Sequence, residues 1–253
     1  RYVETVGGDV LCLEAATGAD VWRTSMVRDF QGAVPKWGYS ESPLVDGDRV
    51  ICTPGAKDAM LVALDKKTGK PLWKASLPHA DAANYSSPVA ADIGGVRQYV
   101  QFLQKGAIAV RANDGQYLWR GKFETPDPGY SCNTPLVADG LIFLSCQYSS
   151  AALRPPSAGD IPAQTVYNAK EMGNVNHGAV AVGGYVYGAK IRDSFVCLDF
   201  KTGKLIWQEK NPNAAAVLYA DGHLYMRDDK GLVTLAEAAP DAYREKGRFT
   251  QPQ

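Results

Sequence analysis

The phrase "DKKTGKPLW" (Asp65 to Trp73) returns later in the chain as "DFKTGKLIW" (Asp199 to Trp207). Two looser copies end at Trp22 and Trp119, and in all four copies a glycine stands four residues before the tryptophan. Each copy predicts a β-hairpin, because alternating apolar residues precede a polar turn whose glycine can adopt the positive φ that hairpin turns need. A hairpin repeated in one register restricts the chain to a fold built from equivalent units.

The distances between the copies predict further hairpins. Trp22 and Trp73 are 51 residues apart, the next interval is 46, and the last is 88, which is twice 44. A fifth hairpin is therefore expected near position 163, with Gly159 in the turn and Val166 and Tyr167 in the aromatic place. A sixth is expected over residues 232–243, with its aromatic residue at Tyr243.

A second type of segment lies between the hairpins. Three copies begin at Tyr39, Tyr85 and Tyr130, and two weaker copies span 177–188 and 215–226. Each reads as a short apolar strand, a turn with Asp-Gly or Gly-Gly, and a second apolar strand. One period thus holds four antiparallel strands, and no helical pattern interrupts them.

Four antiparallel strands every 40 to 50 residues predict an all-β fold, a β-propeller of four-stranded antiparallel blades. Six outer hairpins against five inner ones predict about five complete blades plus one partial blade, open or truncated at the N-terminus. Residues 1–253 are expected to form a single domain, because the repeats run from end to end. A β-sandwich is the alternative, but a sandwich does not repeat a nine-residue phrase.

Composition limits the partners. Lys and Arg number 27, as do Asp and Glu, so no net field favours nucleic acid or an anionic membrane. No apolar run approaches the roughly 18 residues that a membrane-spanning helix needs. We therefore expect no nucleic-acid partner and no transmembrane segment.

The five cysteines indicate neither zinc nor a fixed disulfide pattern. No C-x-x-C motif occurs. Cys12 and Cys197 share the repeat position that Ala63, Ala109 and Thr234 fill elsewhere, which is typical of a small buried side chain. Free cysteines are thus favoured, and a pairing of Cys132 with Cys146 across one hairpin stays open.

The residues before each inner strand are the candidate ligand-binding residues, since these segments converge on the axis of a propeller. Their aromatic, amide and hydroxyl groups suit a polar ligand. For any single residue, a local role with hydroxyls bonded to nearby backbone is the favoured alternative. His177 is the one candidate for acid–base work, and Glu41 is the one acid of the set. The candidates are Trp37, Tyr39, Glu41, Asn84, Tyr85, Tyr130, Asn133, Asn176 and His177; no catalytic residue and no metal-binding set is assigned.

The phrases "LDKKTGKPLWK" and "LDFKTGKLIWQ" resemble the PQQ-type propeller repeat, and the resemblance covers essentially the whole chain. Asn176-His177-Gly178, the strand 184–188 and the turn from Cys197 to Lys204 resemble exported repeat proteins of the BamB-like type. That resemblance implies a periplasmic or otherwise exported protein, a non-catalytic scaffold or binding module of the kind found in outer-membrane assembly. Its partner is expected to be a protein or polymer, bound on the loop-rich face.

The same repeat occurs in PQQ-dependent quinoprotein alcohol dehydrogenases, and this is the alternative function. The resemblance implies that such an enzyme has adjacent cysteines over the quinone, calcium held by Glu, Asn and Asp, and a Trp stacked on the cofactor. No two cysteines are adjacent here, and no set of residues matches the calcium ligands. PQQ and calcium are therefore expected only under the enzyme alternative, and the scaffold is the favoured function.

Overall fold

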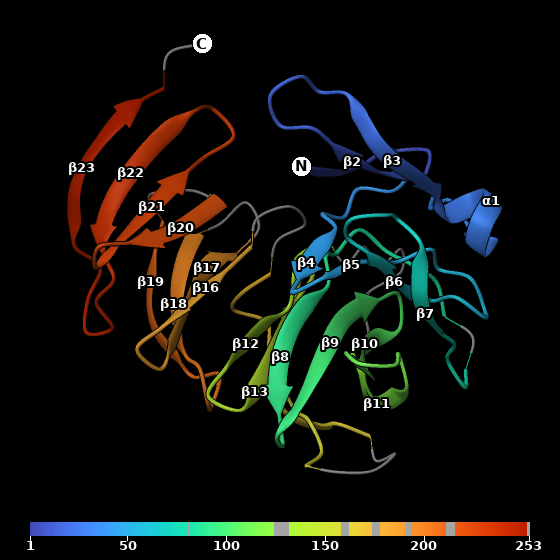
Figure 1. The fold of residues 1–253 in the computed structure, drawn as a ribbon. Helices are drawn as coiled ribbons and strands as arrows, with labels where there is room; N and C mark the ends of the chain where they lie inside the picture. The colour runs from blue at the N-terminus through green and yellow to red at the C-terminus, as the bar shows by residue number, and fades with distance from the viewer. Residues whose placement is uncertain are drawn as a thin grey trace. The chain divides into compact units, whose positions relative to one another are not determined.

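The computed structural model describes residues 1–79, 81–123, 132–157, 162–173, 178–190, 194–210 and 216–251 (Figure 1). The chain forms two compact units, one of Arg1–Glu124 with Pro155–Ala163 and one of Thr125–Arg154 with Gln164–Gln253. Each unit contains three antiparallel sheets, and in every sheet the strands follow one another in sequence order. The single domain expected for residues 1–253 stays a prediction.

The first unit contains one three-stranded and two four-stranded sheets. The three-stranded sheet consists of β1 (Tyr2–Glu4), β2 (Asp9–Leu13) and β3 (Asp20–Ser25). The four-stranded sheets are β4 (Leu44–Asp46), β5 (Arg49–Cys52), β6 (Leu61–Asp65) and β7 (Pro71–Ala75), then β8 (Val89–Ile93), β9 (Val96–Leu103), β10 (Gly106–Arg111) and β11 (Tyr117–Lys122).

The second unit contains three four-stranded sheets. They are β12 (Leu136–Ala138), β13 (Leu141–Ser145), β14 (Ser150–Arg154) and β15 (Gln164–Ala169); β16 (Val180–Val182), β17 (Tyr185–Lys190), β18 (Ser194–Asp199) and β19 (Leu205–Glu209); and β20 (Ala216–Ala220), β21 (His223–Arg227), β22 (Leu232–Glu237) and β23 (Glu245–Thr250). The described sheets therefore number five with four strands and one with three, which confirms the predicted blades.

One short helix departs from the expected all-strand pattern. The helix α1 spans Met26–Phe30 and directly follows β3. Ser25 caps it, because its Oγ accepts a hydrogen bond from the backbone N–H of Arg28 at 3.3 Å. Asp29 completes the cap by accepting from the N–H of Ser25 at 2.7 Å. A single helical turn is too short to leave an amphipathic pattern in the sequence.

The hydrophobic cores lie between neighbouring sheets of each unit rather than within single sheets. In the first unit, one cluster joins Val10 and Trp22 of the three-stranded sheet to Val50 and Val62 of the next sheet. In the second unit, equivalent clusters join β14 to β17 and β18, and β18 to β21 and β22. Neighbouring sheets thus bury each other's faces, as expected for stacked blades.

The four repeated tryptophans occupy equivalent places in the last strand of their sheets, as predicted. Each stands directly across from a small residue, in the pairs Cys12 with Trp22, Ala63 with Trp73, Ala109 with Trp119 and Cys197 with Trp207. Tyr167 stands across from Ala152 in the same register, which confirms the fifth hairpin. The small residue leaves room for the ring across the ladder, and this accounts for the shared Cys and Ala position.

The rings dock on the following sheet of the same unit. Trp22 donates through Nε1 to the carbonyl oxygen of Lys66 at 2.9 Å, and Trp73 donates likewise to Ala112 at 3.1 Å. Both acceptors lie in the glycine turn of the next hairpin. A methyl group at Gly69 would come within 2.5 Å of the Trp22 ring, so this glycine is required by close approach as well as by its φ of +70°.

The docking continues in the second unit, where the Tyr167 hydroxyl donates to the Phe200 carbonyl at 2.9 Å and Trp207 Nε1 donates to that of Ala239 at 3.0 Å. The sixth hairpin differs from the prediction, because Tyr243 lies in its connection and packs edge-on against Trp207 at 5.7 Å. Gly247 occupies the tryptophan place, opposite Leu235 and not opposite Thr234, which the sequence places at the small-residue position. A larger residue across the ladder therefore accompanies the loss of the ring.

All five cysteines are free. Cys52, Cys146 and Cys197 are buried, and Cys12 and Cys132 are half-buried. The structure thus supports core packing for these thiols, and Cys132 and Cys146 do not form a disulfide.

Replacing Trp73 with Ala should lower the free energy of unfolding by about 3 kcal/mol, because the ring and its hydrogen bond to the next sheet are both lost. Hydrogen exchange should rise first in the turn 111–116 and in β10 and β11, since stacked sheets couple mainly to their neighbours. L72A is the matched control: Leu72 precedes Trp73 in β7 but is 51% exposed, so a small effect is expected. A uniform rise in exchange across both units would contradict local coupling.

Candidate functional site

The predicted site residues of the first unit fall in two segments, 31–43 before β4 and 81–88 before β8. The structure divides them into an exposed aromatic group, formed by Trp37 and Tyr85, and a buried polar group centred on Glu41. Tyr39 and Asn84 are buried, at 3% and 7% exposure. The two groups offer different chemistry and are described in turn.

The exposed aromatic group holds Trp37 and Tyr85 together. Their ring centroids are 5.6 Å apart with the planes tilted by 44°. The backbone N–H of Trp37 donates to the Tyr85 hydroxyl at 3.4 Å, and Lys36 Nζ lies 5.1 Å from the centre of the Trp37 ring. Trp37 is nevertheless 55% exposed. A large aromatic ring is thus fixed in place while about half of its surface meets solvent.

Other exposed apolar side chains lie beside this ring. The N–H of Tyr39 donates to the carbonyl oxygen of Val6 at 3.0 Å, so the turn before β2 lies against the loop of Trp37. Val6 is 68% exposed, and Val34 of the same loop is 50% exposed. We refer to Val6, Val34, Trp37 and Tyr85 as the Trp37 surface. Phe30, the last residue of α1, does not belong to this surface, because it is 5% exposed and packs in the core of the first unit.

The buried polar group centres on the carboxylate of Glu41, which is 7% exposed. Its Oε1 accepts the backbone N–H of Thr53 at 2.6 Å, and its Oε2 accepts Nε2 of Gln101 at 3.3 Å. The same Nε2 also donates to the carbonyl oxygen of Ser86 at 2.8 Å. Glu41 therefore ties the segment before β4 to the end of β5 and to the middle of β9.

A second carboxyl group, from Glu4 of β1, lies within hydrogen-bonding reach of Glu41. Burial and the neighbouring Glu41 charge raise the pKa of Glu4 to about 10. Burial also raises the pKa of Glu41, to about 7, although the hydrogen bonds from Thr53 and Gln101 oppose that rise. Two buried carboxyl groups this close cannot both carry a negative charge at low cost.

Two further buried groups respond to this pair. Burial and the charges of Glu4 and Glu41 raise the pKa of the Tyr39 hydroxyl, which donates to the Pro54 carbonyl at 2.8 Å. Burial followed by the same two charges raises the pKa of the Cys52 thiol. The side chains around the pair are thus held in their neutral forms, and Cys52 is not an activated thiolate.

Of the remaining predicted residues, the structure describes Asn133. In the second unit, Asn133 is buried and its Nδ2 donates to Ser145 Oγ at 3.0 Å and to the Ser145 carbonyl at 3.3 Å, so it links two segments of one sheet. Tyr130, Asn176 and His177 lie outside the described residues. Ligand binding by the candidate set therefore stays a prediction.

The sequence reading missed three members of the buried polar group, namely Glu4, Thr53 and Gln101. One signal was available for Gln101, because this amide interrupts the apolar run from Tyr99 to Leu103. A polar side chain in a strand that is buried on both faces needs a partner. Glu4 gave no such signal, since an acid at the end of a short strand is usually solvated.

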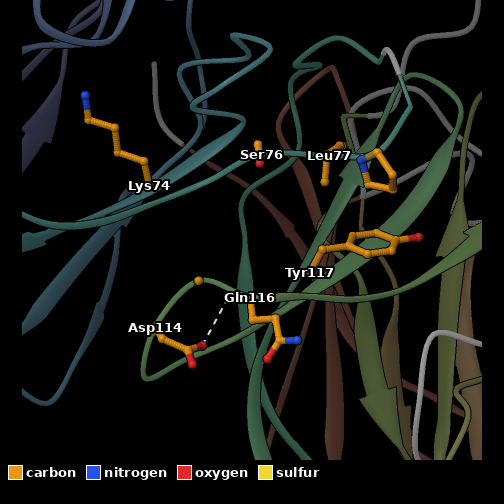
Figure 2. A pocket seen from close by; sticks show the side chains of 8 residues that line it. Lys74, Ser76, Leu77, Asp114, Gln116 and Tyr117 are labelled. Carbon is orange, nitrogen blue, oxygen red and sulfur yellow. Dashed lines mark hydrogen bonds between the residues drawn. The ribbon is translucent and has the colours of Figure 1, made fainter.

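A separate pocket of about 470 Å³ lies in the first unit, between the end of β7 and the turn before β11 (Figure 2). Its lining includes Lys74, Leu77 and Tyr117, and Asp114 accepts the N–H of Gln116 at 3.1 Å within it. Gly115, also in the lining, is the glycine on which Trp73 docks. None of the predicted site residues lines the pocket, and the pocket lies beside the contact between Trp73 and Gly115.

Within the described part of the chain, no group of three or more His, Cys, Asp or Glu side chains is placed to hold a metal ion. In the same residues, no helix has the length and apolar character needed to cross a membrane. The arrangement in the first unit therefore offers an exposed aromatic surface for contact and, beneath it, a buried carboxyl pair.

A family model described as outer membrane protein assembly factor BamB matches residues 1–159 and 150–241. The crystal structure of BamB from Moraxella catarrhalis superposes with a TM-score of 0.72 at 16% identity, covering 98% of this chain and 70% of that one. The likeness establishes the β-propeller fold.

Quinone-dependent enzymes also match. A quinoprotein ethanol dehydrogenase of Pseudomonas aeruginosa is 28% identical over 154 residues, which are 53% of this chain and 24% of the enzyme. The chain thus spans about a quarter of the length of this curated relative. A quinohemoprotein alcohol dehydrogenase of Pseudomonas putida HK5 superposes with a TM-score of 0.60 at 12% identity, over 96% of this chain and 51% of the enzyme.

The carboxyl pair predicts an unusual pH dependence of stability when divalent cations are removed with EDTA. Because the folded-state pKa values of Glu4 and Glu41 are raised, the folded state keeps protons that the unfolded state releases above about pH 4.5. The stabilising contribution is complete at lower pH and is lost as the pH rises. We expect the free energy of unfolding to fall by roughly 1–3 kcal/mol between pH 5 and pH 7.

The variant E4Q provides the control, since glutamine mimics the protonated acid at every pH. In EDTA it should match the original protein at pH 5 and exceed its stability at pH 8, as judged by urea unfolding. If E4Q were the less stable protein at pH 8, the two carboxyl groups would not be in repulsive contact.

Proposed function

Since the chain belongs to the family of the outer membrane protein assembly factor BamB, we propose that it is part of a non-catalytic scaffold that binds a protein partner. A fold of this kind serves many functions, so the proposal depends on the surface rather than on the propeller. The observation that carries it is the Trp37 surface, an exposed aromatic and aliphatic area built on loops of the first unit.

The composition of the Trp37 surface suits contact with a protein. Aromatic residues are enriched at the centres of protein interfaces because a rigid ring buries much area at little entropic cost. Trp37 is already fixed by Tyr85, so binding would not need to order it. Val6 and Val34 extend the apolar area, and Lys36 adds a charge at its edge. These features favour a partner that presents apolar side chains.

The proposed location follows from the same membership. We propose that the protein is exported and acts at the outer membrane, because the family is named for the assembly of outer membrane proteins. The partner would then be a protein of the cell envelope.

The alternative is a quinone-dependent dehydrogenase, and the 28% identical ethanol dehydrogenase is the observation that favours it. The described residues of the first unit do not fit the quinone, which is planar and carries carboxylates. The buried polar group holds two carboxyl groups, and no cationic side chain is among the groups acting on Glu4. Its charge would therefore repel the carboxylates of the quinone. Trp37 is inclined at 44° to Tyr85, so the two rings do not form parallel walls for a flat cofactor. The scaffold is therefore the better-supported function.

Photo-crosslinking tests the proposed surface. A benzoyl-phenylalanine in place of Val34, in the full-length protein in the cells that make it, should give discrete adducts with another protein upon irradiation. Adding W37A should reduce these adducts at least several-fold, because the central aromatic anchor is lost. The same photo-reactive residue at Asp92, whose side chain is 68% exposed on strand β8, is the matched control. Equal adducts from both positions, or adducts insensitive to W37A, would refute the surface.

Titration with PQQ tests the enzyme alternative. In the presence of calcium, micromolar PQQ should cause no saturable quenching of tryptophan fluorescence beyond that seen with free tryptophan. Saturable quenching that W37A abolishes would instead support a quinone site at this position. Dye-coupled oxidation of ethanol, measured in the same samples, would then decide whether the bound quinone is active.

A further inference from the structure

Buried oxygen atoms without a hydrogen-bond partner are concentrated at the carboxyl pair. In the described residues, five buried side-chain nitrogen or oxygen atoms have no partner. Four of them are oxygens of this one group, namely both carboxyl oxygens of Glu4, Oγ1 of Thr53 and Oε1 of Gln101. Thr53 is 1% exposed and Gln101 is fully buried. Unpaired buried polar atoms are rare in folded proteins, so four at one place require an explanation.

All four atoms belong to residues that contact or neighbour the carboxylate of Glu41. Thr53 donates its backbone N–H to Oε1 of Glu41, and Gln101 donates its Nε2 to Oε2. The Glu4 carboxyl group lies within hydrogen-bonding reach of the same carboxylate. The side-chain amide of Gln101 donates to Glu41 and to Ser86, whereas its side-chain carbonyl oxygen has no partner. With Glu4 ionised, three of the four unpaired atoms can only accept, and no cationic side chain acts on Glu4, so the group holds more acceptors than positive charge.

A single shared proton does not satisfy this arrangement. One proton between Glu4 and Glu41 would remove the repulsion between them, but it would pair with only one of the four oxygens. A divalent cation would balance both carboxylate charges and accept several oxygen ligands at once. Carboxylate, amide carbonyl and hydroxyl oxygens are hard donors, which suit calcium better than a transition metal.

We propose that Glu4, Glu41, Thr53 and Gln101 bind one divalent cation of the calcium type. Calcium accepts six to eight oxygens in flexible geometry, including bidentate carboxylates, whereas magnesium demands a near-octahedral set and retains water. Sodium would leave one of the two negative charges uncompensated. Glu4 as a whole is half-buried, but its two carboxyl oxygens are buried, so the ion would be held away from solvent.

The proposed ion would join the three sheets of the first unit. Glu4 belongs to β1, Glu41 and Thr53 flank the strands β4 and β5, and Gln101 lies in β9. This set differs from the Glu, Asn and Asp that hold calcium beside the quinone in the related enzymes, and it needs no quinone. The site is also independent of the proposed scaffold function, although Tyr39 connects it to the loop of Trp37.

Calcium titration at pH 7.5, following treatment with EDTA, tests the site. Calorimetry should show one calcium ion bound per chain, and calcium at 100 times the dissociation constant should raise Tm by roughly 5–10 °C. Terbium should bind in its place and emit when tyrosine is excited, because Tyr39 lies beside the carboxyl pair. Magnesium should give the smaller rise in Tm.

The variant E4Q separates loss of calcium binding from loss of folding, because it is expected to fold well in EDTA. It should lose the calcium-dependent rise in Tm and the terbium emission, and E41Q should lose both as well. D92N removes an exposed carboxylate of the same unit and should retain the full response. If calcium leaves Tm unchanged and releases no heat in the original protein, a proton or a water molecule fills the group and the proposal is wrong. It is equally wrong if E4Q responds to calcium as strongly as D92N.

Discussion

Each unit of this protein depends on one contact, in which an aromatic ring at the end of one hairpin docks on the glycine turn of the next. The contact has three requirements that the sequence meets together. A small residue must stand across the ladder from the ring, as Ala63 does for Trp73. A glycine must stand in the receiving turn, as Gly115 does for Trp73, and a backbone carbonyl there must accept the ring's N–H or O–H, as that of Ala112 does. Trp207 is the exception, because it docks on Ala239 in a connection that holds no glycine. One hairpin therefore has two roles: its turn receives the ring of the preceding hairpin, and its outer strand supplies a ring to the following one. The spacing between glycine and tryptophan is constant because both roles depend on it.

The docking leaves the segments before the inner strands free to vary, and in the first unit they carry the chemistry. There the loop before β4 exposes Trp37 while it buries Glu41 only four residues later. The buried carboxylate holds Thr53 and Gln101 by hydrogen bonds, so the loop is attached to two sheets beneath the exposed ring. A fixed support under an apolar surface reduces the entropy that a partner must overcome on binding. The polar group and the aromatic surface thus act together in shaping this face.

Sequence reasoning predicted the parts of the structure that repeat. The four tryptophans, Tyr167 and the four-stranded sheets follow from a phrase whose spacing is set by local turn chemistry. The sixth hairpin was placed wrongly because Gly247 replaces the ring that marks the others, and Tyr243 lay close enough to mimic it. The buried polar group was only partly predictable, since Glu4, Glu41 and Gln101 come from three sheets and meet only after these stack. Short helices such as α1 are set by local caps and leave no periodicity to detect.

The docking contact also has a direction, since the rings of Trp22, Trp73, Tyr167 and Trp207 are each supplied by an earlier hairpin and received by a later one. A complete repeat carries one ring and one receiving turn. If such a repeat is duplicated or deleted, each ring still meets a receiving turn where the flanking repeats are newly joined. Genes for such proteins can therefore gain or lose whole blades by recombination between repeats without creating an unmatched surface. The near-identical phrases at residues 65–73 and 199–207 are the kind of sequence at which such recombination begins.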